Sequence, residues 1–244
     1  MRRAWVRVAV LAVVLVVAAT LNAEAAGTKT GSAVGLWGFR VERAVVRDHT
    51  QPRNNLTLVG NWSRASGKNG SPAVAFGGRS IARTPNRPEL NPGRRTFGVA
   101  IAFRFPRGMN ALTGTDSPNL VQKGLFGSPG QWKLEILKYT GGHVQCRMFG
   151  SRRKVDVVSP TPDIVRDRAW HQAACLRTDH KVVLVVDGRR TVRNVGVGTV
   201  SNDNPMTVAN KYRSAGTDQF HGLVDSLAIS RGRRALATVL NATS

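Results

Sequence analysis

Paired carboxylates are the first pattern that would carry chemistry, because glycoside hydrolysis uses two acids flanking the scissile bond. Beyond residue 25 the sequence holds three glutamates, Glu42, Glu89 and Glu135, and none has an acidic residue two positions away. Glu135 has Lys133 and Leu137 at those positions, which favours a surface carboxylate paired with Lys133 or with an arginine across a strand. Carboxylates brought together from different strands would still allow hydrolysis, so a glycoside hydrolase stays an alternative.

The histidines and serines do not form a recognisable catalytic motif. The sequence contains no Gly-x-Ser-x-Gly turn and no His-Glu-x-x-His helix motif. Five histidines are present: His49, His143, His171, His180 and His221. His171 follows Trp170 on an expected strand, and because no partner triad accompanies it, we expect its ring to be bonded across a sheet. We therefore assign no catalytic residue.

The first 25 residues have the pattern of an export signal. Arg2, Arg3 and Arg7 precede a run of 12 apolar residues at 8–19, and Ala23-x-Ala25 is a small-residue cleavage pattern. Spanning a bilayer takes about 20 apolar residues, so the run is too short, although an uncleaved anchor is the alternative. We expect cleavage between Ala25 and Ala26, a secreted protein, and no transmembrane segment in the mature chain.

Export changes the interpretation of the two cysteines. Cys146 and Cys175 would meet an oxidising compartment, where disulfides persist, and their even number fits one bridge. Closing a loop of that length is worth roughly 3–4 kcal/mol in the chain-entropy model. Two free buried thiols or a metal pair are the alternatives. A bridge would join adjacent strands or facing sheets.

Most elements that would position these residues are predicted to be strands. Within 97–105, the residues Phe97, Val99, Ile101, Phe103 and Phe105 alternate with the slimmer Gly98, Ala100, Ala102 and with Arg104. Similar period-2 segments lie at 132–137, 144–149, 170–177, 181–187 and 223–230. Segment 233–240 fits either a helical turn or a final strand. The pattern predicts an all-β sandwich or barrel.

Several short sequences occur in an order that points to a family. They are Leu36-Trp37-Gly38-Phe39, Leu90-Asn91-Pro92-Gly93, Val121-Gln122-Lys123-Gly124, Trp132-Lys133-Leu134-Glu135, Trp170-His171, Val186-Asp187-Gly188 and Phe220-His221-Gly222-Leu223-Val224-Asp225. Their order and spacing resemble the laminin-G-like, concanavalin A-like jelly-roll domains of secreted bacterial proteins, and the cysteine positions resemble an actinobacterial branch. The resemblance covers residues 34–231 as one jelly-roll domain, which leaves the signal peptide at 1–25, a lead at 26–33 and a tail at 232–244.

The resemblance also implies a fold and ligands. The family fold is a two-sheet antiparallel jelly roll with one concave sheet, and it commonly binds carbohydrate or glycosylated partners. Relatives that cleave β-glucans carry Glu-x-Asp-x-x-Glu on one strand, which this sequence lacks. Relatives often hold a structural calcium ion, for which Asp225 and Glu42 are the matching candidates. Arg40 and Arg43 lie close to Glu42 and would repel a divalent cation.

Positive charge is the strongest compositional feature. The chain has 36 basic and 14 acidic residues, a formal net charge of +22. The basic residues are scattered and no nucleic-acid fold motif is present, so we expect no specific nucleic-acid partner. Such a surface attracts polyanions, which outside a cell include anionic envelope polymers and acidic polysaccharides. A general compositional bias toward arginine is the alternative explanation.

Exposed aromatic residues with polar neighbours are the candidates for a sugar-binding rim. Trp62, Tyr139 and Tyr212 are expected in turns or loops, with Arg213 beside the last of them. Loops that pack over the sheet ends are the alternative. Together these observations predict a secreted, non-catalytic binding module for a polysaccharide, a glycoconjugate or an anionic cell-envelope polymer. A structural or protein-adhesion module is the second alternative beside the hydrolase.

Overall fold

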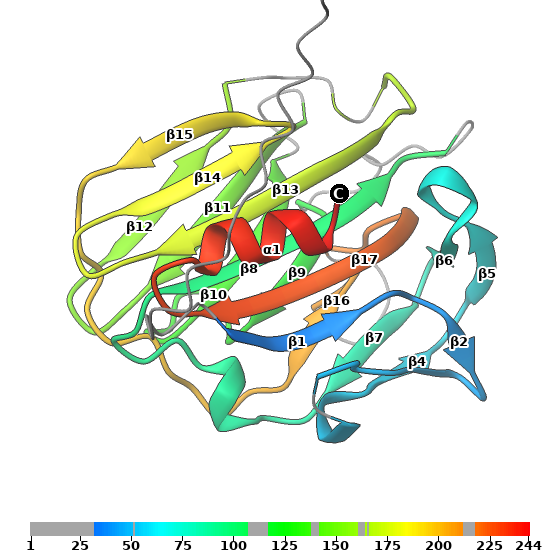
Figure 1. Cartoon of the computed structure of the whole chain (residues 1–244), viewed down its shortest axis with the longest axis horizontal. Helices are drawn as coiled ribbons and strands as arrows, with labels where there is room; N and C mark the ends of the chain where they lie inside the picture. Colours follow the sequence, from blue (N-terminus) through cyan, green and yellow to red (C-terminus); the bar gives the residue numbers. More distant parts are fainter. Residues whose placement is uncertain are drawn as a thin grey trace, which may run out of the picture.

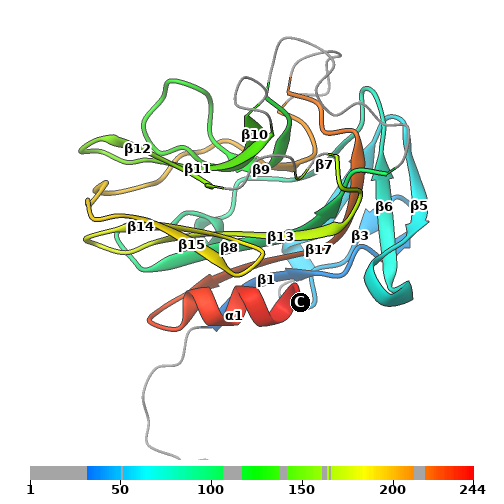
Figure 2. The same cartoon turned by 90° about the horizontal axis from the view of Figure 1, so that it is seen from above.

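The computed structural model describes residues 32–50, 52–106, 117–137, 142–160, 164, 166–211 and 218–244. In these ranges nearly all regular structure is β-strand, arranged as two antiparallel sheets that face each other (Figures 1 and 2). This confirms the predicted all-β jelly-roll sandwich. The expected signal peptide lies outside the described residues. No helix in the described ranges is long and apolar enough to cross a bilayer.

The first sheet, here called sheet A, has eight strands in the described chain. In spatial order they are β15 (Arg189–Arg193), β14 (Val182–Val186), β13 (Trp170–Arg177), β8 (Phe97–Arg104), β17 (Gly222–Arg231), β6 (Pro72–Phe76) and β5 (Trp62–Ser66), with β1 (Ser32–Trp37) also pairing with β17. The strand expected at 97–105 is therefore central in this sheet.

The second sheet, sheet B, has nine strands in the described chain. Their order is β12 (Lys154–Val158), β11 (His143–Phe149), β10 (Trp132–Leu137), β9 (Asn119–Lys123), β16 (Met206–Val208), β7 (Ile81–Thr84), β4 (Leu56–Val59), β3 (Val45–Val46) and β2 (Val41–Glu42). Three short 3-10 helices lie in those connections that the structure describes, at Pro52–Asn54, Lys68–Gly70 and Pro88–Leu90.

The core lies between the sheets and is built from the bulky alternating residues. Phe97 packs against Trp132 of the facing sheet with ring centroids 5.3 Å apart, and both are fully buried. The indole nitrogen of Trp132 donates to the carbonyl of Leu90 at 3.1 Å, so the buried polar atom is satisfied. Cys146 on β11 and Cys175 on β13 form a disulfide, which confirms the predicted bridge and places it between the facing sheets.

The helix α1 (Ala235–Ala242) resolves the question left open for 233–240. It packs on the outer face of sheet A, away from sheet B (Figure 2). The slim residues of β8 make this contact feasible, because a Cβ added at Gly98 would lie 3.1 Å from the carbonyl oxygen of Ala235. The segment expected to be a tail thus continues the packed structure.

Candidate functional site

The outer face of sheet B carries a continuous row of polar side chains, here called the polar row. Strand pairing places its members opposite one another across seven strands: Asp156, Arg147, Lys133, Gln122, Thr207, Arg83 and Thr57. At a strand spacing of about 4.8 Å, six steps span about 29 Å. A second, shorter row beside it consists of Gln145, Glu135 and Asn119.

Period-2 alternation is what places these side chains on the outer face. On β10, Trp132 and Leu134 lie in the core, so Lys133 and Glu135 must face outward. The strand β11 follows the same rule, with Cys146 in the core. The sequence pattern that fills the sandwich thus also creates the polar face.

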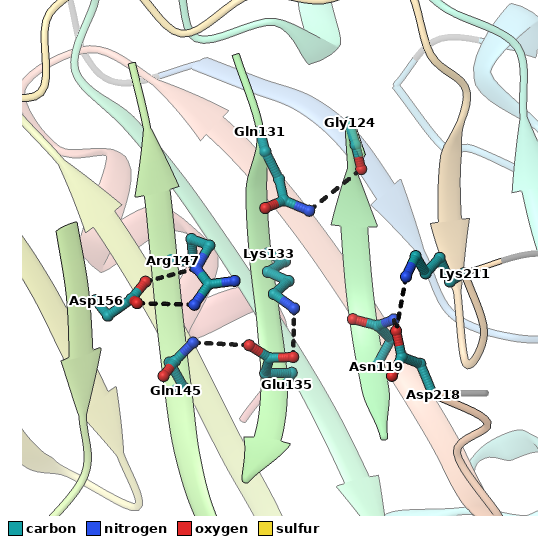
Figure 3. Close-up of polar contacts among 10 residues, drawn as sticks. All are labelled: Asn119, Gly124, Gln131, Lys133, Glu135, Gln145, Arg147, Asp156, Lys211 and Asp218. Carbon is teal, nitrogen blue, oxygen red and sulfur yellow. Dashed lines mark hydrogen bonds and ion pairs between the residues drawn. The ribbon is translucent and has the colours of Figure 1, made fainter. Parts of the chain in front are cut away.

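Two sets of charge pairs organise the centre of this face (Figure 3). Lys133 forms an ion pair with Glu135, whose other carboxylate oxygen accepts a hydrogen bond from the Gln145 amide at 2.7 Å. Arg147 donates from Nε and Nη2 to the two carboxylate oxygens of Asp156 at 2.6 and 2.8 Å. The two-bond geometry fixes the plane of the guanidinium.

Burial sets the protonation behaviour of the Lys133–Glu135 pair. Each side chain is 5% exposed. Desolvation lowers the pKa of Lys133 and raises the pKa of Glu135, and the attraction between the two charges opposes both shifts. The sequence-based expectation of pairing with Lys133 is confirmed, whereas the expectation of a surface carboxylate is wrong, since the side chain of Glu135 is almost fully buried.

Asp218 brings a further carboxylate toward this centre. Its side chain accepts from the Asn119 amide at 3.3 Å and lies 3.5 Å from the ammonium of Lys211 (Figure 3). Its negative charge also contributes to the raised pKa of Glu135, after burial. Asp218 precedes β17, so this acid reaches the face from a segment that is distant in sequence.

Several buried polar atoms on this face have no hydrogen-bond partner in the described structure. They are Nη1 of Arg147, Oδ1 of Asn119 and Oγ1 of Thr207. An unsatisfied buried polar group costs roughly 1–3 kcal/mol, so each is a group that gains from a ligand or a bound water. One donor, one acceptor and one hydroxyl are suited to sugar hydroxyl groups.

Phe126 adds an aromatic surface beside these polar groups. The residue lies in the turn between β9 and β10 and is 63% exposed. Three cations surround its ring, with Lys133 Nζ, Arg147 Cζ and Lys211 Nζ at 5.9, 5.3 and 6.0 Å from the centroid. The exposed ring thus lies beside three positively charged groups, within the range of cation–π attraction.

The other end of the polar row is open. Thr57 and Arg83 are exposed, and with Thr84, Pro85 and Pro205 they line a pocket of about 300 Å³. The row therefore runs from the enclosed charge pairs on β10 and β11 to an accessible pocket on β7 and β4.

The expected sugar-binding rim is described only in part. Trp62 is the first residue of β5 rather than part of a turn, because it pairs with Phe76, and it packs half-buried against the main core. Tyr139, Tyr212 and Arg213 lie outside the described residues. The rim remains a prediction.

The two calcium candidates are both engaged by protein groups. Glu42 pairs with Arg47 at 2.8 Å, and Asp225 accepts from the backbone N–H of Lys68 at 2.8 Å and from the hydroxyl of Ser71. The described ranges contain no group of three or more His, Cys, Asp or Glu able to hold a metal. These surroundings do not fit a calcium cage on this pair. Thermal melting with added calcium or chelator tests the prediction.

His171 is held by two aspartates at one end of sheet A. Its Nδ1 lies 2.8 Å from Asp187 and its Nε2 lies 2.9 Å from Asp167. Burial alone would lower the pKa of His171, but the hydrogen bonds and charges of both carboxylates outweigh it and raise the pKa above its usual value. Asp187 belongs to the β14–β15 turn, so the ring is bonded within the sheet, as expected.

The sequence reasoning missed Phe126, Gln145 and Arg147 as site residues. Phe126 follows Leu125 in a segment between Gly124 and Gly127, so two large apolar residues lie between two glycines, which are typical of turns. That mismatch was a usable signal. The role of Arg147 had no comparable signal in the sequence, because the strands that bring it beside its partners are paired only in the fold.

Comparisons with known proteins agree with this architecture. Among solved structures, the binding domain of Paraclostridial Mosquitocidal Protein 1 matches with a TM-score of 0.66 and 15% identity, over 86% of this chain and 51% of that one. Domain 4 of an extracellular arabinanase from Geobacillus stearothermophilus, solved with arabinotriose, matches with a TM-score of 0.63 and 17% identity, over 88% and 99% of the two chains. The binding domain of botulinum neurotoxin DC with SialylT gives 0.54 and 12%, over 86% and 50%.

These structures differ in extent from the present chain. The chain spans about half the length of the two toxin binding domains and nearly all of the arabinanase domain. At such identities the likeness shows the fold. No curated protein sequence matches the chain. A family model described as the concanavalin A-like lectin/glucanases superfamily, in its laminin G group, matches residues 109–239, which is more than half of the chain, and the protein therefore belongs to this superfamily.

Proposed function

We propose that this protein is a secreted glycan-binding module whose ligand lies along the outer face of sheet B. The observation that carries the proposal is the polar row together with the unpartnered atoms of Arg147, Asn119 and Thr207. Buried polar groups are normally hydrogen-bonded, so these atoms have bonding capacity for a ligand or an ordered water.

The proposed contacts divide between stacking and hydrogen bonding. Phe126 offers an exposed ring against which a sugar packs, and the neighbouring cations hold that ring over the face. Thr57 and Arg83 are the exposed hydrogen-bonding members of the row, and the enclosed Nη1 of Arg147, Oδ1 of Asn119 and Oγ1 of Thr207 bond to the ligand through bridging waters. The ion pairs with Asp156 and Glu135 keep the side chains in place before the ligand arrives, which reduces the ordering cost of binding.

Support for a carbohydrate ligand comes from the structural neighbours. The arabinanase domain was solved with arabinotriose, and the neurotoxin binding domain was solved with SialylT. We extend that chemistry to a polysaccharide or glycoconjugate for this chain. The disulfide fits an extracellular location. An anionic envelope polymer is a further candidate on the ground of the net charge of +22.

Retention on a glycan array at low and at high salt tests the proposal. We expect retention that survives high salt and that falls about tenfold, or about 1.4 kcal/mol, in Phe126→Ala. Leu125→Ala is the matched control, because Leu125 is the exposed neighbour of Phe126 in the same turn and its aliphatic side chain offers no ring face to a cation or a sugar. Retention lost entirely at high salt, or unchanged in Phe126→Ala, would contradict a lectin site on this face.

Glycoside hydrolysis is the second candidate function. The specific observation is that Glu135 has a raised pKa, as a general acid requires, and that it interacts electrostatically with Asp218. Release of reducing sugar from a panel of polysaccharides, lost in both Glu135→Gln and Asp218→Asn, would establish the enzyme. If the wild-type protein binds polysaccharides of the panel but releases no reducing sugar from them, the result contradicts hydrolysis and supports the binding module.

A further inference from the structure

A second pocket lies where several connections meet at the end of β13. Its volume is about 240 Å³, and its lining consists of Arg94, Arg152, Arg177, Asp179, His180 and Gly198. None of these residues belongs to the polar row. The turn between β13 and β14 that contributes to it lies at the left end of the molecule in Figure 2.

Arg177 forms the fixed part of this pocket. The last residue of β13, it is 1% exposed. Its Nη1 donates to the carbonyls of Gly93 and Arg95, both at 3.0 Å, and its Nη2 donates to the carbonyl of Gly198 at 3.1 Å. Three carbonyls from two connections therefore hold the guanidinium in one orientation.

One donor of this guanidinium is left over. Nε of Arg177 is buried and has no hydrogen-bond partner in the described structure. The nearest acidic group, Asp179, lies 3.6 Å from Nη2 rather than at Nε, and its side chain is 69% exposed. Arg177, which lines the pocket, therefore keeps a positive charge whose hydrogen-bonding capacity the protein does not fully satisfy.

The walls of the pocket are held by backbone hydrogen bonds. Gly93 and Val200 exchange both bonds of an antiparallel bridge, at 2.8 and 3.0 Å, which positions Arg94. The N–H of Arg152 donates to the carbonyl of Val197 at 3.0 Å. The N–H of His180 donates to the hydroxyl of Thr178 at 3.3 Å. These bonds fix the backbone of the lining residues, whereas Arg94, Arg152 and His180 themselves are exposed.

The charge balance selects an anion. Three arginines face one carboxylate, and His180 adds a donor. The planar fork of arginine matches the geometry of phosphate and similar oxyanions, with two parallel hydrogen bonds. A single carboxylate is too few ligands for a cation. From the pocket, the unpartnered donor and this charge set, we propose that the Arg94–Arg152–Arg177 pocket binds a tetrahedral oxyanion, the phosphate or sulfate group of a ligand.

Calorimetric titration with inorganic phosphate and with sulfate, at constant ionic strength set with chloride, tests the pocket. We expect saturable binding that weakens at least tenfold in the double variant Arg94→Ala/Arg152→Ala. The matched control is Arg40→Ala/Arg79→Ala, which removes the same charge from two exposed arginines that do not line the pocket. Both double variants should melt as the wild-type protein does, because neither removes a buried group.

Two results would overturn the proposal. One is the absence of saturable binding of either anion, and the other is an equal loss in the control variant, which would reduce the effect to general positive charge. A second variant sharpens the test without risk to the fold. Asp179→Asn removes the opposing carboxylate at the exposed rim, and we expect it to bind phosphate several-fold more tightly.

The source of the oxyanion is distinguished by competition. A phosphodiester polymer that displaces inorganic phosphate, where a sulfated polysaccharide does not, identifies a phosphorylated ligand, and the reverse identifies a sulfated one. The pocket does not depend on the proposed glycan site. Phe126→Ala should keep its phosphate binding, and Arg94→Ala/Arg152→Ala should keep its salt-resistant glycan retention, so failure of either idea is seen separately.

Discussion

The outer faces of the two sheets differ in what covers them. On sheet A, Ala100, Ala174 and Ala228 lie beneath Ala235 and Val239 of α1, and all five are buried. On sheet B, the equivalent positions carry ion pairs, amides and hydroxyls, and no α-helix of the described chain lies on them. Small apolar residues on an outer face therefore mark a surface that the chain itself closes. Enclosed polar residues mark the face on which we propose that a glycan binds.

Breaking the charge pair on sheet B should have the largest effect on stability. Glu135→Leu leaves the ammonium of Lys133 buried without its partner, and we expect the free energy of unfolding to fall by about 3 kcal/mol. Lys133→Met/Glu135→Leu removes both charges and should recover most of that loss. Urea denaturation measures both, and a double variant as unstable as the single one would show that the charges do not act as a pair.

Enlarging a residue on sheet A should have the next largest effect. Leucine at Gly98 would push against Ala235 and Val239, with the Cβ alone 3.1 and 3.4 Å from their nearest atoms. We expect Gly98→Leu to lower the free energy of unfolding by about 2 kcal/mol. Arg83→Leu on the open end of sheet B is the matched control and should change it by less than about 0.5 kcal/mol. Equal effects at the two positions would remove the contrast between the faces.

Titration of His171 gives sheet A a pH dependence of its own. Because its folded pKa is raised, His171 contributes stability that is fully present below its ordinary pKa of about 6.5 and is lost as the pH rises through the folded value. The stability advantage of the wild-type protein over His171→Asn should therefore shrink between pH about 5.5 and about 9. Denaturation midpoints of both proteins at the two pH values measure it. An advantage that grows with pH would contradict the raised pKa.

The smallest stability effect is expected at Phe126. Its ring is 63% exposed, so Phe126→Ala should change the free energy of unfolding by less than about 0.5 kcal/mol. The same variant is expected to lose glycan retention, so the two measurements separate binding from folding. A large loss of stability would show that the ring serves mainly to cover the charge pairs.

The strands were predictable from sequence because alternation is a local property. The 97–105 segment showed its bulky and slim faces directly, and β8 (Phe97–Arg104) has both. The reason for the slim face was not readable, since 233–240 is too short to show a helical period and its contact with Gly98 is made only in the fold. Likewise, Lys133 was recognisable as a partner of Glu135, but their burial depends on β11 and on the turn that carries Phe126.

The anion pocket shows the same limit more strongly. Its arginines come from separate connections, and Arg94 and Arg177 are 83 positions apart in the chain. Only the antiparallel pairing of Gly93 with Val200, and the end of β13 beside it, brings them together. In the sequence they were indistinguishable from the other scattered basic residues.

The disulfide has a consequence for handling the protein. Cys146 lies on β11 between Gln145 and Arg147. Its bond to Cys175 links the core-facing side of β11 to sheet A, while Gln145 and Arg147 lie on the outer side of the same strand. Both cysteines are fully buried, so dithiothreitol reaches the bond only when the sandwich opens, and protein unfolded in a thiol reagent would refold without this tether. Preparations for affinity measurements should accordingly be purified without thiol reagents and checked for a complete cystine.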